Sequence, residues 1–258
     1  MGTLKLVGLG LSLKYLTPKA LEELKNSDIV YLDSYTSVSC DISEEKLREK
    51  GINVTAVDRN FIENNTKKII DDLNNGKIVS IASIGDPVIA TTHVSLLVEA
   101  KNKGHEVKVI PGVSVHCYII SKSLLSSYKF GKSVTITYPI NGKIDITPYN
   151  VLKENLERGL HTIFYLDIRD GKLMTAREAI ELLLEMEKLE KGNIVNKDSL
   201  VVVGERLGCE DEEVVSLTVE EALNYKFIQP PHIIVFPSKS LHFMELEGLK
   251  CLRQSRKE

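Results

Sequence analysis

The chain has 258 residues, of which 43% are hydrophobic and 27% charged, and its formal net charge is −3. A chain of this length can bury one large core or two modest ones, and it lacks the excess of positive charge that nucleic-acid backbones attract. Its apolar runs are far shorter than the roughly 20 residues that span a bilayer, and its N-terminus begins with a strand pattern rather than a secretion signal. We therefore expect a cytoplasmic protein with neither a nucleic-acid nor a membrane partner.

The first half of the chain alternates short apolar strands with amphipathic helices. Strands are predicted near residues 5–10, 28–34, 52–58, 77–83 and 105–111, with one helix in each of the four intervals. The first helix opens with Thr17 and Pro18, which are typical N-cap and first-turn residues. This alternation is typical of a mostly parallel sheet with helices on both faces.

The second half predicts an α/β domain with a mixed sheet. Helices are expected over residues 113–127, 148–158, from 175 and from 218, and strands over 133–139, 160–167, 199–206, 214–217 and 232–237. Residues 214–217 are expected to pair antiparallel with a neighbouring strand, the last strand to end the regular structure, and the tail 248–258 to fray. Because Pro111-Gly112 follows the fifth strand, we place the boundary there: residues 1–112 form an N-terminal α/β domain with the GLG and GDP loops, and residues 113–258 a C-terminal α/β domain.

The four cysteines show no pattern that predicts chemistry. Cys40, Cys117, Cys209 and Cys251 are widely separated and form no C-x-x-C pair. The six histidines occur without the H-E-x-x-H spacing of a metal site. We interpret the cysteines as reduced thiols and expect no metal ion.

The segment IASIGDPVIATTH, residues 81–93, is the most informative candidate site. Asp86 stands directly after a buried strand, and the carboxyl ends of strands are where open α/β sheets bind ligands. An ordinary turn is the alternative, because glycine, aspartate and proline are common turn residues. Ile89 adds an apolar wall, and Thr91 or Thr92 can cap the helix that follows.

The first strand ends in Gly8-Leu9-Gly10-Leu11, which suggests a dinucleotide fingerprint with Asp33 as the ribose-binding acid. Leucine stands at position 13 where that fingerprint has its third glycine, and the helix begins too late to meet a pyrophosphate. What survives is a strand end whose backbone can approach a ligand closely.

Two further strand boundaries carry candidate residues. In Pro111-Gly112-Val113-Ser114, the hydroxyl of Ser114 either binds a carboxylate or simply caps the next helix. In Pro230-Pro231-His232, the histidine begins a strand, where it either contacts a ligand or bonds a neighbouring carbonyl.

Taken together, G-x-G after the first strand, GDP after the fourth and P-G-x-S after the fifth resemble the class III S-adenosylmethionine-dependent methyltransferases, the tetrapyrrole methylase superfamily. Within that superfamily the chain is similar to the diphthine synthase family. The finer resemblance covers nearly the whole chain and rests on residues 35–37, 85–93, 128–133, 157–168, 174–184 and 230–237.

The resemblance implies two α/β domains with the ligand cleft between them and, usually, a homodimer. The cofactor would be S-adenosyl-L-methionine, leaving S-adenosyl-L-homocysteine as product. The reaction would be repeated N-methylation of the 3-amino-3-carboxypropyl-histidine of translation elongation factor 2, which gives diphthine. Matched position by position, the cofactor-binding residues would be Leu11, Asp86, Ile89, Ser114, Val115, Leu166, Leu207 and His232.

No catalytic residue is assigned. A sulfonium methyl is already activated, so alignment of the reacting atoms contributes most, and burial of the acceptor ammonium beside a sulfonium would lower its pKa without a dedicated base. Two alternatives stay open: a methyltransferase for a corrin or tetrapyrrole precursor, and a non-catalytic nucleotide-sensing or interaction protein.

Overall fold

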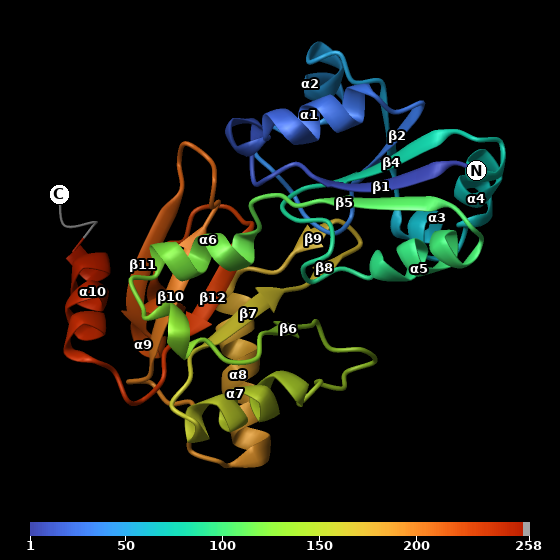
Figure 1. Cartoon of the computed structure of the whole chain (residues 1–258). Helices are drawn as coiled ribbons and strands as arrows, with labels where there is room; N and C mark the ends of the chain where they lie inside the picture. Colours follow the sequence, from blue (N-terminus) through green and yellow to red (C-terminus); the bar gives the residue numbers. More distant parts are fainter. Residues whose placement is uncertain (255–258) are drawn as a thin grey trace. The chain divides into compact units, whose positions relative to one another are not determined.

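The computed structural model describes residues 1–254 of the chain. It divides into two compact units, Met1–Val115 and His116–Glu258, each built around its own five-stranded sheet (Figure 1). Within the described part of the chain, no helix is long and apolar enough to cross a membrane.

The first unit contains a fully parallel sheet in the strand order β3-β2-β4-β1-β5. Its strands are β1 (Thr3–Gly8), β2 (Ile29–Asp33), β3 (Val54–Val57), β4 (Ile78–Ser83) and β5 (Glu106–Ile110). Its helices are η1 (Leu13–Tyr15), α1 (Pro18–Lys25), α2 (Glu44–Glu49), α3 (Arg59–Glu63), α4 (Lys67–Asn74) and α5 (Val94–Asn102). The predicted strands are confirmed, but the interval between β3 and β4 holds two α-helices instead of one. Asn64 and Asn65, both weak helix formers, separate them.

Apolar residues cover both faces of this sheet. Leu4 and Leu6 of β1 pack into a cluster with α4 and α5, whereas Val7 and Leu9 join α1 and α2 on the opposite face. Figure 1 shows these two pairs of helices on the two sides of the strands. Successive side chains of a strand point to opposite faces of the sheet. A sheet that helices cover on both faces therefore needs apolar residues at consecutive positions of its strands.

The second unit contains a mixed sheet in the order β11-β10-β12-β7-β6, in which only β6 and β7 pair in parallel. Its strands are β6 (Val134–Ile136), β7 (Thr162–Leu166), β10 (Leu200–Glu205), β11 (Glu213–Thr218) and β12 (His232–Phe236), and β8 (Ile168–Arg169) and β9 (Lys172–Leu173) form a separate hairpin. Its helices are α6 (Val115–Lys122), η2 (Ser127–Lys129), α7 (Thr147–Glu157), α8 (Ala176–Glu190), α9 (Val219–Asn224) and α10 (Phe243–Gln254). Capping boxes open α8 and α9 as predicted.

The C-terminal helix α10 corrects the expectation that regular structure ends at β12 and that the tail frays. Residues 248–254 of that tail are helical, and residues 255–258 lie outside the described residues. Gly248 weakens the helical signal of the sequence, but the buried side chain of Leu249 fixes the helix through packing that no local pattern reveals.

The cysteine expectation is wrong for two residues. Cys40 takes part in a disulfide, and so does Cys209, whereas Cys117 and Cys251 are exposed thiols. Spacing along the sequence carries no information on which sulfur atoms come within bonding distance, so the sequence offered no signal for this difference.

A buried carboxylate fastens α10 to the second unit. Oε1 of Glu245 accepts hydrogen bonds from the Ser126 backbone N (3.0 Å) and His161 Nε2 (2.8 Å). Oε2 accepts from Lys129 Nζ (2.7 Å) and the His242 backbone N (2.8 Å). Burial by itself would raise the pKa of Glu245, but the hydrogen bonds of Lys129 and the backbone lower that pKa to about 2.

Replacing Glu245 with alanine is expected to lower the free energy of unfolding by about 3 kcal/mol, because it leaves the His161 and Lys129 donors without their carboxylate. Urea denaturation at pH 7 measures the loss. The folded pKa lies below the ordinary value of 4.5, so the stabilisation is complete above pH 4.5 and is lost as the pH falls toward 2. Glu247→Ala on the same helix is the control. The ion pair of Glu247 with Lys250 is exposed, so its loss should lower the free energy of unfolding by less than about 0.5 kcal/mol. Equal losses in the two variants would contradict the assignment.

Candidate functional site

Three loops meet at the carboxyl edge of the first sheet. They follow β4, β1 and β5, which are neighbours in the sheet with β1 in the middle. The backbones of the first two loops are joined directly, since Gly10 N donates to Gly85 O (3.1 Å) and Gly85 N donates to Gly10 O (2.8 Å). Gly10 adopts φ of +74°, a backbone conformation that residues other than glycine rarely adopt.

The third loop packs against the other two without room for a side chain. A Cβ on Gly112 would lie 2.2 Å from Gly85 O and 2.8 Å from the carbonyl carbon of Gly8. We call this meeting of Gly8, Gly10, Gly85 and Gly112 the glycine junction. Packing leaves no room for a Cβ on Gly8 or Gly112, and a positive φ favours glycine at positions 10 and 85. The junction brings together the three motifs singled out in the sequence.

Asp86 ties the junction together. Its Oδ1 accepts hydrogen bonds from Val88 N (2.9 Å) and Ile89 N (3.2 Å), which forms the turn that the sequence offered as an alternative. Its Oδ2 accepts from Gly112 N (3.1 Å), so the same side chain also links the loops after β4 and β5. The residue is 7% exposed.

Of the other cofactor-binding residues predicted in the first unit, Leu11, Ile89 and Ser114 belong to the same three loops, and Val115 begins α6 directly after Ser114. Leu11 and Ser114 are buried, Val115 is half-buried, and Ile89 exposes 37% of its surface. The structure thus brings the five predicted residues Leu11, Asp86, Ile89, Ser114 and Val115 to one edge of one sheet, whereas their contact with a cofactor stays a prediction.

The threonines after Asp86 do not cap the next helix. His93 is the N-cap residue of α5 and makes no side-chain cap. Thr91 Oγ1 donates to Pro87 O (2.8 Å) and Thr92 Oγ1 donates to Glu63 Oε1 (2.8 Å). Both hydroxyls therefore hold the loop itself, and the expectation of a threonine cap is wrong.

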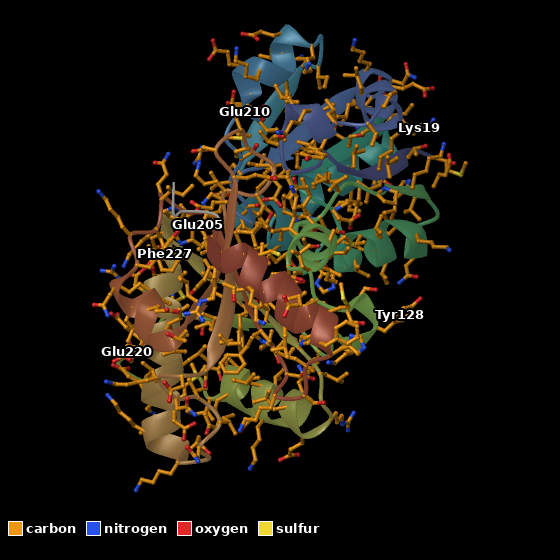
Figure 2. All side chains as sticks on the ribbon, turned by 90° about the vertical axis from the view of Figure 1, so that its left-hand side faces the viewer. Lys19, Tyr128, Glu205, Glu210, Glu220 and Phe227 are labelled. Carbon is orange, nitrogen blue, oxygen red and sulfur yellow. The ribbon has the colours of Figure 1, made fainter. Side chains whose placement is uncertain are left out.

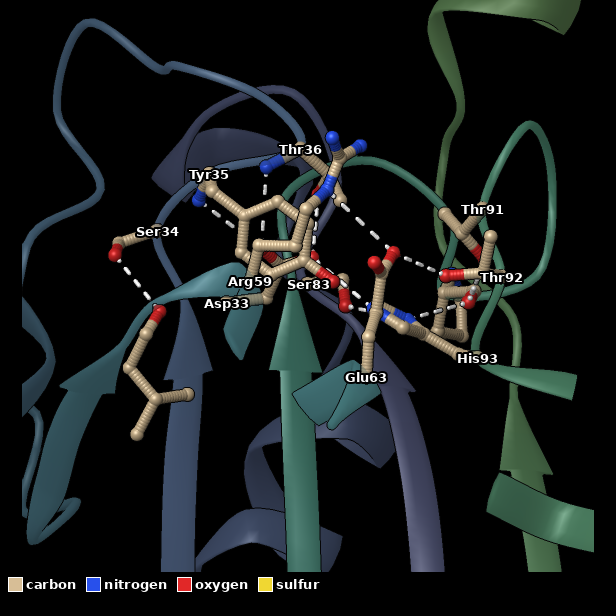
Figure 3. A network of polar contacts seen from close by, with 12 residues as sticks. Asp33, Ser34, Tyr35, Thr36, Arg59, Glu63, Ser83, Thr91, Thr92 and His93 are labelled. Atoms are coloured by element: carbon tan, nitrogen blue, oxygen red, sulfur yellow. Dashed lines mark hydrogen bonds and ion pairs between the residues drawn. The ribbon is translucent and has the colours of Figure 1, made fainter. Parts of the chain in front are cut away.

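A second layer of polar residues lies beneath this edge (Figure 3). Asp33 ends β2 and Ser83 ends β4, and the imidazole of His93 lies between them. Asp33 is fully buried and its oxygens accept hydrogen bonds from the backbone N of Tyr35 and Thr36 and from the Thr36 hydroxyl. It is therefore not placed as an acid for a ribose. His93 was not singled out in the sequence, although it ends the segment that carries Asp86.

The three residues predicted in the second unit share an edge of its mixed sheet. His232 begins β12, Leu166 ends the adjacent antiparallel strand β7, and Leu207 follows two residues after Glu205, the register partner of His232 on β10. Leu207 is buried and Leu166 half-buried.

The His232 side chain is occupied within its own unit. Nδ1 accepts a hydrogen bond from Ala176 N (3.0 Å), and Nε2 therefore carries the proton and donates to Ile228 O (2.8 Å). Burial lowers the pKa of His232. The ring of Phe227 packs against the imidazole, with 5.7 Å between the two ring centroids. Figure 2 labels Phe227 and Glu205. A ligand would meet the backbone of His232 rather than a ring nitrogen.

Known proteins resemble the chain over its whole length. Residues 3–223 match the model of the family described as Tetrapyrrole (Corrin/Porphyrin) Methylases. The chain is 62% identical to a diphthine synthase of Sulfurisphaera tokodaii over 252 residues, covering 98% of this chain and 99% of the relative. It is 57% identical to a diphthine synthase of Saccharolobus solfataricus over 258 residues, covering 99% and 100%. A crystal structure of diphthine synthase, 32% identical, matches with a TM-score of 0.87 and covers 98% of this chain and 96% of that one.

Proposed function

This chain belongs to the tetrapyrrole methylase family and, within it, to the diphthine synthases, and from that premise we propose how it binds its methyl donor and which substrate it modifies. It is an S-adenosylmethionine-dependent methyltransferase. The proposed substrate is translation elongation factor 2, at the amino group of its 3-amino-3-carboxypropyl-histidine. The full-length identity to diphthine synthases carries this proposal.

The donor site that we propose in the first unit is the edge formed by the glycine junction. The residues fit such a ligand because Asp86 supplies a carboxylate and Ile89 an exposed apolar surface at this edge. A carboxylate has about four acceptor positions, and three backbone N–H groups use the carboxylate of Asp86. Its remaining acceptor capacity can bind an amino or hydroxyl group of the donor. Leu11, Ser114 and Val115 complete the proposed contacts.

Three positions in the second unit are proposed to contact the donor as well. Leu166 supplies half-buried apolar surface at the edge of the mixed sheet, and the buried Leu207 lies at the same edge. His232 contributes its backbone, because both ring nitrogens already have partners. The cleft between the units and the homodimer both stay predictions of the resemblance.

When bound, S-adenosylmethionine supplies a methyl group that its sulfonium charge activates. The task of this chain is then to hold the donor still and to exclude water around the acceptor amine, since alignment of two reacting atoms about 3 to 3.5 Å apart accounts for much of the rate. No side chain is assigned as a general base. The proposed substrate places the reaction in the cytoplasm.

Mass spectrometry of the substrate tests the proposal. The protein is incubated with S-adenosylmethionine and elongation factor 2 that carries the 3-amino-3-carboxypropyl-histidine, and a gain of up to three methyl groups on that residue is expected. Elongation factor 2 with an unmodified histidine is the control and should gain none. Methylation of a corrin precursor alone would replace the proposed substrate, and binding of the donor without any product would remove the enzymatic function.

A further inference from the structure

The loop that carries Asp86 is held from below by a buried imidazole. His93 is 1% exposed. Its Nδ1 lies 3.0 Å from Pro87 O and 3.5 Å from Ser83 Oγ, and its Nε2 lies 3.4 Å from Asp33 Oδ2. Figure 3 shows the ring between the ends of the two strands and the loop.

The contact with Pro87 fixes where the ring proton lies. A carbonyl oxygen can only accept a hydrogen bond, so Nδ1 of His93 carries the proton and donates it to Pro87 O. Pro87 follows Asp86 directly, and its carbonyl belongs to the turn whose N–H groups Asp86 accepts. The orientation of this turn therefore depends on a side chain that lies beneath the loop.

The opposite side of the ring faces a carboxylate that is itself immobile. Asp33 accepts hydrogen bonds from Tyr35 N (3.1 Å), Thr36 N (3.1 Å) and the Thr36 hydroxyl, so its oxygens are fixed at the end of β2. Nε2 of His93 makes no hydrogen bond with any residue that the structure describes, although it is buried against Asp33 Oδ2. The tautomer that donates to Pro87 O leaves Nε2 without a proton, so the carboxylate of Asp33 limits the space open to the ring without bonding to it.

We propose that His93 is a positioning residue, which holds the Gly85-Asp86-Pro87 turn in the conformation that binds the methyl donor. The inference rests on the donor site proposed above. His93 does not touch the donor: it acts through its hydrogen bond to Pro87 O. Thr92 and Glu63 fasten the far end of the same loop to α3, so the turn is held at both ends.

Two substitutions of similar polarity separate this role from general packing. In His93→Asn the amide nitrogen takes the place of Nδ1 and can still donate to Pro87 O. In His93→Gln the longer side chain carries its amide to the place of Nε2 and loses that donor. Isothermal titration with S-adenosyl-L-homocysteine is expected to give a Kd near the wild-type value for His93→Asn. For His93→Gln and His93→Ala we expect a Kd raised by about tenfold, the effect of one lost hydrogen bond. With saturating donor, kcat should stay near wild type while the donor KM rises.

His105→Ala is the matched control. His105 is a second buried histidine of the same unit, and its Nδ1 accepts from Gly2 N (3.3 Å) at the amino edge of the sheet. Its loss is expected to lower the melting temperature without changing the Kd. A Kd raised equally by His105→Ala, or equal values for His93→Asn and His93→Gln, would overturn the positioning role. If His93→Ala fails to fold, the Asn and Gln variants alone decide. Absence of binding by the wild type is a separate result, because it would remove the donor site itself and the positioning role with it.

Discussion

Replacing Gly112 with alanine is expected to raise the Kd for S-adenosyl-L-homocysteine by about a hundredfold, equivalent to about 2.7 kcal/mol. The added Cβ would lie 2.2 Å from Gly85 O and 2.8 Å from the carbonyl carbon of Gly8. Both neighbours are backbone atoms at the ends of packed strands, so neither can move aside as a flexible side chain would. The loops after β4 and β5 must therefore separate, which disrupts the glycine junction. We also expect the free energy of unfolding to fall by about 3 kcal/mol, the upper part of the range for overpacking.

Gly104→Ala is the control for the general cost of removing a glycine. Gly104 has φ of +83° but nothing within 4 Å of the position of a Cβ. This variant should lose about 1 kcal/mol of stability through its backbone conformation and keep its affinity. If Gly112→Ala binds the product as tightly as the wild type does, the glycine junction is not the donor site.

Replacing Asp86 with asparagine is expected to raise the same Kd by about tenfold and to lower the free energy of unfolding by about 1 kcal/mol. An asparagine oxygen at Oδ1 can still accept from Val88 and Ile89, but the amide NH₂ that replaces Oδ2 faces the N–H of Gly112. The link between two loops is then lost while the turn survives. Asp86→Ala removes the turn's hydrogen bonds as well as the link to Gly112, and it should lower the free energy of unfolding by about 3 kcal/mol. Its effect on folding therefore accompanies the loss of affinity.

Asp72→Asn provides the comparison for the change of charge. Asp72 pairs with Lys77 (2.7 Å) at the partly exposed amino end of β4, where such a pair contributes less than about 1 kcal/mol. Calorimetric titration and urea denaturation should therefore show a clear loss of affinity and of stability in Asp86→Asn, and at most a small loss of stability in Asp72→Asn. Unchanged affinity in Asp86→Asn would remove Asp86 from the donor site and leave it a purely structural residue.

Much of the first unit could be predicted from the sequence because its signals are local. Each strand is a short apolar run, and Thr17 with Pro18 marks the start of α1 through one hydrogen bond, from Ala20 N to Thr17 Oγ1. Capping boxes at Thr175 and Thr218 are equally local. Such features depend on residues three or four apart, so they can be recognised without knowing the fold.

What the sequence could not reveal depends on residues far apart along the chain. Gly8, Gly85 and Gly112 were recognised as strand ends, but their contact follows from β1 lying between β4 and β5, which no local pattern specifies. His93 was missed because its contacts with Pro87 O and Asp33 depend on the fold, and Asp33 was considered only as a ribose acid. Likewise, α10 was missed because Glu245 finds its partners in distant segments.

Because both ring nitrogens of His232 are hydrogen-bonded, this residue should not determine how the turnover rate depends on pH. One ring nitrogen accepts a hydrogen bond from Ala176 N and the other donates one to Ile228 O, so protonating the ring would require breaking the first of these contacts. Burial moves its pKa downward, away from neutrality. An inflection of the turnover rate above pH 7 therefore reports a different group, and the acceptor amine, which reacts only after losing its own proton, is the one that the chemistry supplies.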